Sequence, residues 1–248
     1  MKTIFLIIPL FPVASVVSAF QMSNISGQVI VIVLFLGSIY AWSIMATKFI
    51  EMKAALEEST RFVSAYKREN HPMALFIKRQ KYSASPLYNL YKAVCSNIGR
   101  LVNAHAANTT ELILEDIGAT KHPLKEYQVR SARNLAEQTL SELTLELEKH
   151  MGILATAATA APFLGLLGTV WGVMDAFGGL AMSGSATLSA VAPGVSGALL
   201  TTVVGLLVAL PSIIGYNILT GRIRKMGVMM ELFVQELMAD IERCFLRE

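Results

Sequence analysis

Three stretches of the chain are apolar for long enough to cross a membrane, and polar segments separate them. The first 21 residues of the stretch 27–49 carry no charge. The stretches 152–182 and 191–219 contain only one charged side chain, that of Asp175. About 20 consecutive apolar residues are enough to span the hydrocarbon core of a bilayer. The pattern therefore predicts an all-α membrane protein with three transmembrane helices.

The N-terminal segment, residues 1–26, has two interpretations. It begins with one lysine, runs apolar, and reaches the small-residue sequence VSA at 17–19, which resembles a signal-peptide cleavage site. A retained interfacial segment explains the same residues, since its two prolines disfavour a straight helix. Both interpretations stay open, and both place residue 20 outside the cytoplasm.

The positions of the basic residues predict the orientation of the chain. Of 21 Lys and Arg residues, 14 lie in the segment 50–150, and none lies between Lys149 and Arg222. Cytoplasmic loops are enriched in Lys and Arg. We therefore expect the N-terminus outside the cytoplasm, the C-terminus inside it, and localisation in the bacterial inner membrane.

Two helical segments are expected to extend into the cytoplasm. No Pro or Gly occurs from Leu124 to His150, so we predict one helix that runs without interruption into the second membrane span as a long rod. The C-terminal segment is amphipathic, with Leu232, Phe233, Leu237 and Ile241 predicted on one side. The complete division is a signal-like or interfacial segment 1–26, membrane helix 27–49, cytoplasmic helices 50–151, membrane helix 152–182, periplasmic turn 183–190, membrane helix 191–219 and cytoplasmic helix 220–248.

Composition agrees with a membrane protein and excludes several other classes. Charged residues make up 16% of the chain, below the roughly 25% of soluble domains. The formal net charge of +3 reflects topology and gives no reason to expect nucleic acid binding. We expect Cys95 and Cys244 to be free thiols, and the four histidines lack metal-ligand spacing. No catalytic motif is present, so we predict that the chain is not an enzyme and holds no metal or cofactor.

Small residues form a stripe on each of the last two membrane helices. Such faces allow helix backbones to approach closely in lipid. A three-helix monomer explains them, but two stripes in a chain with one other span favour packing between subunits. The stripes are Ala161, Gly165, Gly168, Gly172, Ala176 and Gly179, and then Gly194, Ala198, Thr201 or Thr202, Gly205 and Ala209. The predicted helix-packing residues are Gly165, Gly168, Gly172, Pro193, Gly194 and Gly205.

The polar atoms inside these two helices are mostly hydroxyls. Thr169 and Thr202 are about equally far along the chain from the turn, so antiparallel helices place them at similar depth near mid-membrane. A transmembrane threonine often only bonds a carbonyl of its own helix. The two hydroxyls are therefore candidates for function, with a purely local role as the alternative.

Asp175 is the one acid between His150 and Gly221. Acids in membrane spans are candidates for function. Asp175 follows Thr169 by six residues, which is about 9 Å of helical rise and a turn to another side of the helix. We expect it at the outer rim of the membrane. Because no second titratable group accompanies it, the chain alone cannot form an acid-to-acid proton relay.

Two sequences in the last two spans carry a family resemblance. They are GLLGTVWGVMDAF at 165–177 and ATLSAVAPGVSGALLTTVVGLLVALPSIIGYN at 186–217, with SPLYNLY at 85–91 as a weaker local similarity. The chain resembles the MotA/TolQ/ExbB proton channel family, most closely its TolQ and ExbB members. The order of spans and polar segments is similar too.

The resemblance implies a proton-driven assembly. It implies a homopentamer whose lumen holds single-span partners of the TolR or ExbD type, each with one essential Asp, and a TonB- or TolA-like protein as a further partner besides membrane lipid. Protons, rather than a cofactor, are the expected cargo, and Na⁺ stays open as the ion. The lumen-facing threonines of the family match Thr169 and Thr202. Proton-motive force would thereby be coupled to work on the cell envelope, in either Tol-Pal or TonB-dependent transport.

The chain departs from the family pattern at two positions. Gly197 stands where TolQ and ExbB proteins typically carry Glu, and Asp175 stands where relatives usually carry Asn or His. Asp175 compensating for the missing Glu is one hypothesis. The loss of the Glu also gives weight to a different function, a passive membrane scaffold that stabilises a single-span partner without ion flow.

Overall fold

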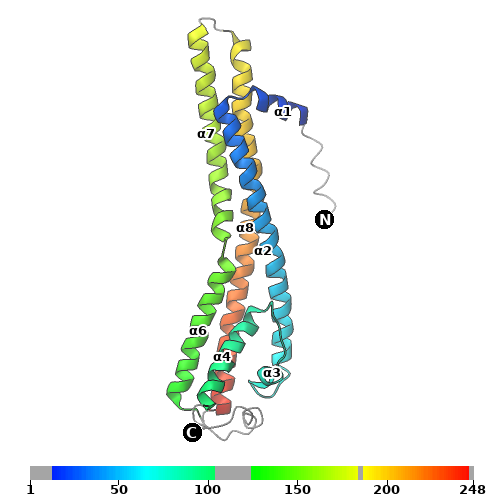
Figure 1. The fold of residues 1–248 in the computed structure, drawn as a ribbon, viewed down its shortest axis with the longest axis vertical. Helices are drawn as coiled ribbons and strands as arrows, with labels where there is room; N and C mark the ends of the chain where they lie inside the picture. The colour runs from blue at the N-terminus through cyan, green and yellow to red at the C-terminus, as the bar shows by residue number, and fades with distance from the viewer. Residues whose placement is uncertain (1–12, 104–123, 184–186, 246–248) are drawn as a thin grey trace. The chain divides into compact units, whose positions relative to one another are not determined.

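The computed structural model describes residues 13–103, 124–183 and 187–245, and the regular structure of these residues is entirely helical (Figure 1). Three helical stretches are long and apolar enough to cross a membrane. They are α2 (Ile25–Tyr66), the stretch that contains α7 (Met151–Ser183), and α8 (Leu188–Phe245). An all-α protein with three membrane-spanning helices is therefore confirmed, while the orientation of the chain and its extension into the cytoplasm stay predictions.

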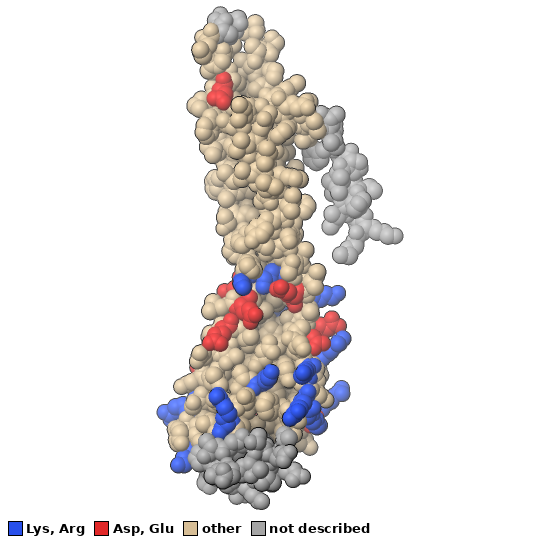
Figure 2. Space-filling model, in the orientation of Figure 1, with Lys and Arg blue, Asp and Glu red and all other residues tan. Residues whose placement is uncertain are grey.

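The chain divides into two compact units, and α2 and α8 contribute to both. The first unit comprises residues 1–46 and 150–218, and the second comprises residues 47–149 and 219–248. On the face shown in Figure 2, charged side chains gather on the second unit, whereas the first is almost entirely uncharged. The boundary that the sequence predicts between apolar spans and charged segments thus coincides with the boundary between the two units.

In the first unit α2, α7 and α8 pack side by side (Figure 1). Leu34 of α2 is buried against Ala161 of α7 and Val208 of α8, which places the core where the three helices meet. Because lipid is as apolar as these side chains, close packing rather than removal from water is what holds the three helices together at this core. The helix α1 (Val13–Met22) precedes α2 and is joined to it at Ser23 and Asn24.

The second unit is built around an aromatic cluster. It contains the ends of α2 and α8 together with α3 (Ala74–Ile77), α4 (Pro86–Asn103) and α6 (Glu126–Glu148). The ring of Phe62 is fully buried, and its centroid lies 5.3 Å from that of Phe233 and 5.4 Å from that of Tyr91. The Tyr66 hydroxyl donates to Asp240 at 2.9 Å. These contacts join α2, α4 and α8.

The sequence SPLYNLY begins α4. Ser85 is buried, and its hydroxyl accepts a hydrogen bond from the backbone N–H of Tyr88 at 3.2 Å, as expected of a residue that caps a helix N-terminus. Leu87, Leu90 and Tyr91 are fully buried. This segment, which carried a weaker part of the resemblance, is a core element of the second unit.

Two expectations about the helices were wrong. The helix after Leu124 does not continue into the membrane span, because Lys149 has an extended conformation (φ −52°, ψ 133°) and His150 is left-handed (φ 69°). A left-handed residue ends a right-handed helix, and neither Gly nor Pro marks this position.

The expectation that Leu232 lies on the same apolar side as Phe233 and Leu237 was the second that was wrong. Leu232 is 59% exposed, whereas Phe233 and Leu237 are buried. One residue turns a helix by about 100°, so the neighbours Leu232 and Phe233 point in different directions.

Some predicted boundaries lie outside the described residues. These include residues 184–186 of the predicted turn 183–190 and residues 1–12 of the signal-like segment. The span predicted at 191–219 and the helix predicted at 220–248 belong, as far as residue 245, to the single helix α8, which continues past residue 219.

Candidate functional site

The backbones of α7 and α8 approach so closely that glycine is required at the contact. A Cβ atom added at Gly165 would lie 2.8 Å from the Thr201 carbonyl oxygen, and one at Gly172 would lie 2.6 Å from the Ala198 Cβ. At Gly205 the nearest atom would be the Ala161 carbonyl oxygen, also at 2.6 Å. Contacts under 3.0 Å force a displacement, so side chains larger than hydrogen do not fit without rearrangement.

These contacts show what the small-residue stripes do. Gly168 approaches Thr201, and Gly194 approaches Ala176, so both stripes pack against each other within one chain. Packing of the two stripes within one chain is what the three-helix monomer, one of the two explanations considered for the stripes, requires. The stripes therefore give no separate argument for contacts between subunits. Pro193, predicted with the packing residues, has an exposed side chain in α8.

Thr201 takes part in this packing. It is fully buried, and its single hydroxyl proton is shared between two carbonyl oxygens, that of Gly165 at 2.9 Å and that of Ala198 at 2.7 Å. The bond to Gly165 joins α8 to α7. The sequence could not decide between Thr201 and Thr202 for the stripe, and the structure assigns the packing role to Thr201.

Thr169 and Thr202 each follow a contact residue by one position. Thr169 follows Gly168, and Thr202 follows Thr201, so each is turned by about 100° from the α7–α8 contact. Because the helices are antiparallel, equal turns bring both side chains to the same side of the helix pair. The register pairs Gly168 with Thr201, so the two threonines also lie at nearly the same height.

This threonine face lies opposite α2. Leu164 and Val204 precede contact residues by one position and pack against the Leu34 cluster, which places α2 on the other side of the helix pair. Around the two threonines the face is apolar and open, with Leu166 54% exposed and Leu206 47% exposed. Among the described residues, helical phase places the hydroxyls of Thr169 and Thr202 at the centre of this face.

The two hydroxyls differ in their hydrogen bonding. Thr169 donates to the Leu166 carbonyl oxygen of its own helix at 2.7 Å and keeps its capacity to accept. The Thr202 hydroxyl oxygen is buried and has no hydrogen-bond partner among the described residues. A buried polar group without a partner costs about 1–3 kcal/mol. The donor and acceptor of Thr202 are therefore both unused among the described residues, and the hydroxyl must rotate toward the surface before water or another chain can bond it.

Asp175 faces the opposite side from the two threonines. It precedes the contact residue Ala176 by one position, and its carboxylate accepts a hydrogen bond from the side-chain amide of Asn24. Asn24 also accepts the backbone N–H of Gly27 at 2.9 Å and so caps the start of α2. Asp175 thus connects α7 to the N-terminus of α2.

Gly197 lies on the same side and is closely covered. A Cβ atom there would lie 2.6 Å from the Ser23 Cα and 2.8 Å from the Ser23 backbone nitrogen. Ser23 is 7% exposed. The junction between α1 and α2 thus occupies the space that a side chain at position 197 needs. Sequence reasoning found Asp175 and Gly197 but missed Ser23 and Asn24, although an Asn before an apolar run is a common helix-capping signal.

The described residues contain no group of three or more His, Cys, Asp or Glu side chains arranged to hold a metal ion. Cys95 and Cys244 are free, with Cys95 buried. Among the described residues inside the membrane helices of the first unit, the threonine face and Asp175 are candidates for ion chemistry.

The sequence is similar to a known protein family and to several named proteins. Residues 100–232 match the model of the MotA/TolQ/ExbB proton channel family. The chain is similar to the Tol-Pal system protein TolQ of Haemophilus influenzae, with 26% identity over 90% of this chain and 92% of that protein. It is similar to the biopolymer transport protein ExbB of Salmonella typhimurium, with 31% identity over 84% of this chain and 79% of that protein. The TolQ of Pseudomonas aeruginosa is 41% identical over 40% of this chain and 42% of its own length.

Proposed function

Because the chain belongs to the MotA/TolQ/ExbB proton channel family, we propose that it is the multi-span subunit of a TolQ–TolR or ExbB–ExbD type complex that couples proton flow to work on the cell envelope. It is an inner-membrane protein with three membrane-spanning helices. Its relatives include proteins named for the Tol-Pal system and for biopolymer transport. In this proposal the titrating carboxyl group belongs to a partner chain.

The observation that carries the proposal is the pair of threonine hydroxyls on one uncharged face. Helical phase brings Thr169 and Thr202 to the same side of α7 and α8 and turns Asp175 to the other side. A carboxylate buried in an apolar environment is strongly destabilised unless hydrogen-bond donors compensate it. The buried Thr202 hydroxyl has no partner among the described residues, so rotation of its side chain toward the surface would let it donate to such a carboxylate without breaking a bond.

The two hydroxyls suit the two protonation states of a carboxyl group. The Thr202 O–H donates to the ionised form, whereas the Thr169 oxygen, whose hydrogen is used by Leu166, accepts from the protonated form or from water. A proton that crosses the membrane through such a site releases about 2.3 kcal/mol per 100 mV of potential. The proposed role of this chain is to hold the partner's acid where it can change protonation state inside the membrane.

One copy of the chain provides only one side of such a site. Because the small-residue stripes are used within the chain, the homopentamer rests on the family resemblance alone. In the proposed assembly each copy presents its threonine face to a central pair of single-span partners. The α7–α8 pair is suited to this because its own contact leaves the apolar side chains around the two threonines, such as Leu166 and Leu206, exposed.

Reconstitution with the partner tests the proposal. The chain and the TolR- or ExbD-like protein from the same genome are purified together and placed in liposomes, and proton influx is followed with a pH-sensitive dye at a fixed potential. Combined Thr169→Ala and Thr202→Ala substitutions are expected to lower proton influx by about tenfold or more, while the complex still assembles. A decrease of this size corresponds to the free energy of about one charge-assisted hydrogen bond.

A matched control removes a hydroxyl elsewhere in the membrane. Ser38 of α2 donates to the Phe35 carbonyl oxygen at 2.7 Å, so Ser38→Ala deletes a membrane hydroxyl on a helix outside the threonine face. This variant should conduct like the unmodified protein. Full influx in the double threonine variant would contradict the proposed site. Absence of influx in the unmodified complex would support the passive scaffold instead.

A further inference from the structure

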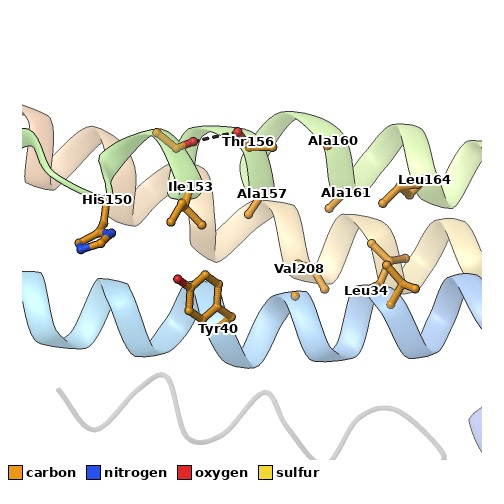
Figure 3. A pocket seen from close by; sticks show the side chains of 13 residues that line it. Leu34, Tyr40, His150, Ile153, Thr156, Ala157, Ala160, Ala161, Leu164 and Val208 are labelled. Carbon is orange, nitrogen blue, oxygen red and sulfur yellow. Dashed lines mark hydrogen bonds between the residues drawn. The ribbon is translucent and has the colours of Figure 1, made fainter.

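A groove runs between α2 and α7 in the first unit and has a volume of about 580 Å³ (Figure 3). Val33, Leu34 and Gly37 of α2 form one wall, Ala157 and Ala160 lie on the α7 wall, and Val208 of α8 lies between the two helices. The groove lies on the opposite side of the helix pair from Thr169 and Thr202. It is therefore separate from the proposed proton site.

Small residues keep the groove open. A Cβ atom added at Gly37 or at Gly152 would meet no atom within 4 Å outside its own helical turn, in contrast to the glycines at the α7–α8 contact. Close packing in the described structure therefore does not require glycine at these two positions. The two glycines instead leave space between two membrane helices. An empty apolar space of this size lacks the contacts that normally stabilise a protein interior.

The polarity of the groove changes along its length. His150 lies at one end, Tyr40 and Thr156 follow it toward the middle, and Leu34, Ala161 and Leu164 lie at the other end (Figure 3). The side chains of His150 and Tyr40 make no hydrogen bond to the described residues. His150 is also the residue at which the long uncharged run begins, directly after Lys149. The polar end thus marks the membrane–water boundary.

The length of the groove matches one leaflet of a bilayer. From Gly152 to Leu164, α7 rises about 18 Å, compared with about 15 Å for half of the hydrocarbon core. The groove is therefore long enough for the part of a hydrocarbon tail that crosses one leaflet.

We propose that this groove binds one acyl chain of a membrane phospholipid, with its headgroup at His150 and Tyr40. The hydrocarbon tail follows the apolar wall toward Leu164, and the glycerol ester and phosphate lie at the end where the His150 ring, the Tyr40 hydroxyl and the Thr156 hydroxyl can bond them. Thr156 donates to the Gly152 carbonyl oxygen at 2.9 Å and remains able to accept. The bound lipid fills the space between α2 and α7 and so joins them. The proposal does not depend on proton conduction.

Native mass spectrometry of the protein released from nanodiscs tests the proposal. The nanodiscs contain equal amounts of dioleoyl phosphatidylethanolamine and dioleoyl phosphatidylglycerol. The expected result is one tightly retained phospholipid per chain, identified by its mass, which also distinguishes it from a free fatty acid. Gly37→Leu and Ala160→Phe place side chains in the groove and should lower the retained fraction by about tenfold or more, since each displaces at least two methylene groups of the tail.

Two further variants sharpen the test. Ala46→Phe adds the same aromatic ring at an exposed position of α2 outside the groove and should retain lipid normally. His150→Asn keeps a residue that tolerates a positive φ but removes the imidazole, and it should weaken retention less than groove filling does. Unchanged retention in both groove-filling variants would overturn the proposal. So would a change in oligomer mass in place of lipid loss, which would identify a second copy of the chain as the occupant.

Discussion

The side-chain amide of Asn24, at the N-terminus of α2, donates a hydrogen bond to the carboxylate of Asp175 on α7, 151 residues later in the chain. The same Asn24 side chain caps α2 by accepting the N–H of Gly27. Asp175 therefore stabilises the helix start in two ways, by fixing the capping residue and by placing negative charge near a helix N-terminus. This gives the one acid of the membrane hairpin a structural role on the side away from Thr169.

Asp175→Asn is expected to leave proton influx unchanged, because an amide oxygen can still accept from Asn24 and no titratable group is required at this position. Asp175→Ala should lower thermal stability in detergent, by about 1 kcal/mol, since the amide of Asn24 loses its acceptor. Asn24→Ala is the matched variant and should have a similar effect. Loss of influx in Asp175→Asn with unchanged stability would instead identify Asp175 as part of the proton pathway.

Gly197→Glu, which restores the residue typical of TolQ and ExbB proteins, is expected to destabilise this protein. The Ser23 backbone lies within 3 Å of the position that a Cβ atom would take, so the α1–α2 junction must move. Overpacking of this kind costs about 1–3 kcal/mol. Gly178→Ala is the control, because a Cβ atom there meets nothing within 4 Å. Equal melting temperatures of the two variants would show that the junction does not pack on Gly197.

Much of the fold follows from hydropathy alone. Three apolar runs of membrane length predict three spans, and the structure has three such helices. The end of α6 could not be predicted in the same way, because Lys149 and His150 are neither Gly nor Pro, and the left-handed conformation of His150 is not marked by the residues around it.

The candidate site could be predicted only in part. The chain positions of Thr169 and Thr202 gave their similar depth, since rise per residue is fixed. Which of Thr201 and Thr202 faces α7 depends on how α8 is rotated about its own axis. A run of small residues is compatible with several such rotations, so the sequence does not determine this angle. The contact of Asp175 with Asn24 joins residues far apart in the chain and needs the packed helices to be seen.

Stability is expected to fall below about pH 6.5 because of His71 in the second unit. Burial lowers the pKa of this imidazole, whose Nδ1 accepts the Met73 N–H at 3.2 Å and whose Nε2 is buried without a partner among the described residues. The unfolded chain then binds more protons than the folded one as pH falls through the ordinary histidine range, which removes stability in that direction. Melting temperatures between pH 5.5 and 7.5 measure this effect. In the His71→Asn variant the melting temperature should decrease less steeply as the pH is lowered. A pH profile identical to that of the unmodified protein would exclude His71 as the source of the decrease.

Cys244 is expected to react with a water-soluble maleimide before Cys95. Cys95 is fully buried, and burial raises the pKa of its thiol to about 12, so little thiolate forms at neutral pH. Cys244 is half-buried. Mass spectrometry should show one label on the folded protein and two after denaturation. Cys244→Ser should then remain unlabelled until it unfolds, and rapid labelling of that variant would contradict the burial of Cys95.

Replacing Thr201 and Thr202 by valine should separate packing from function. Thr201→Val removes the hydroxyl that joins α8 to the Gly165 carbonyl oxygen and should lower stability by about 1–2 kcal/mol. Thr202→Val removes a hydroxyl without a partner and should leave the melting temperature unchanged or slightly raised, because an unsatisfied polar atom is replaced by a methyl group of similar shape. Proton influx in liposomes should nevertheless fall in Thr202→Val. Normal influx in this variant, or a loss of stability as large as in Thr201→Val, would mean that the Thr202 hydroxyl serves the fold rather than a partner's carboxyl group.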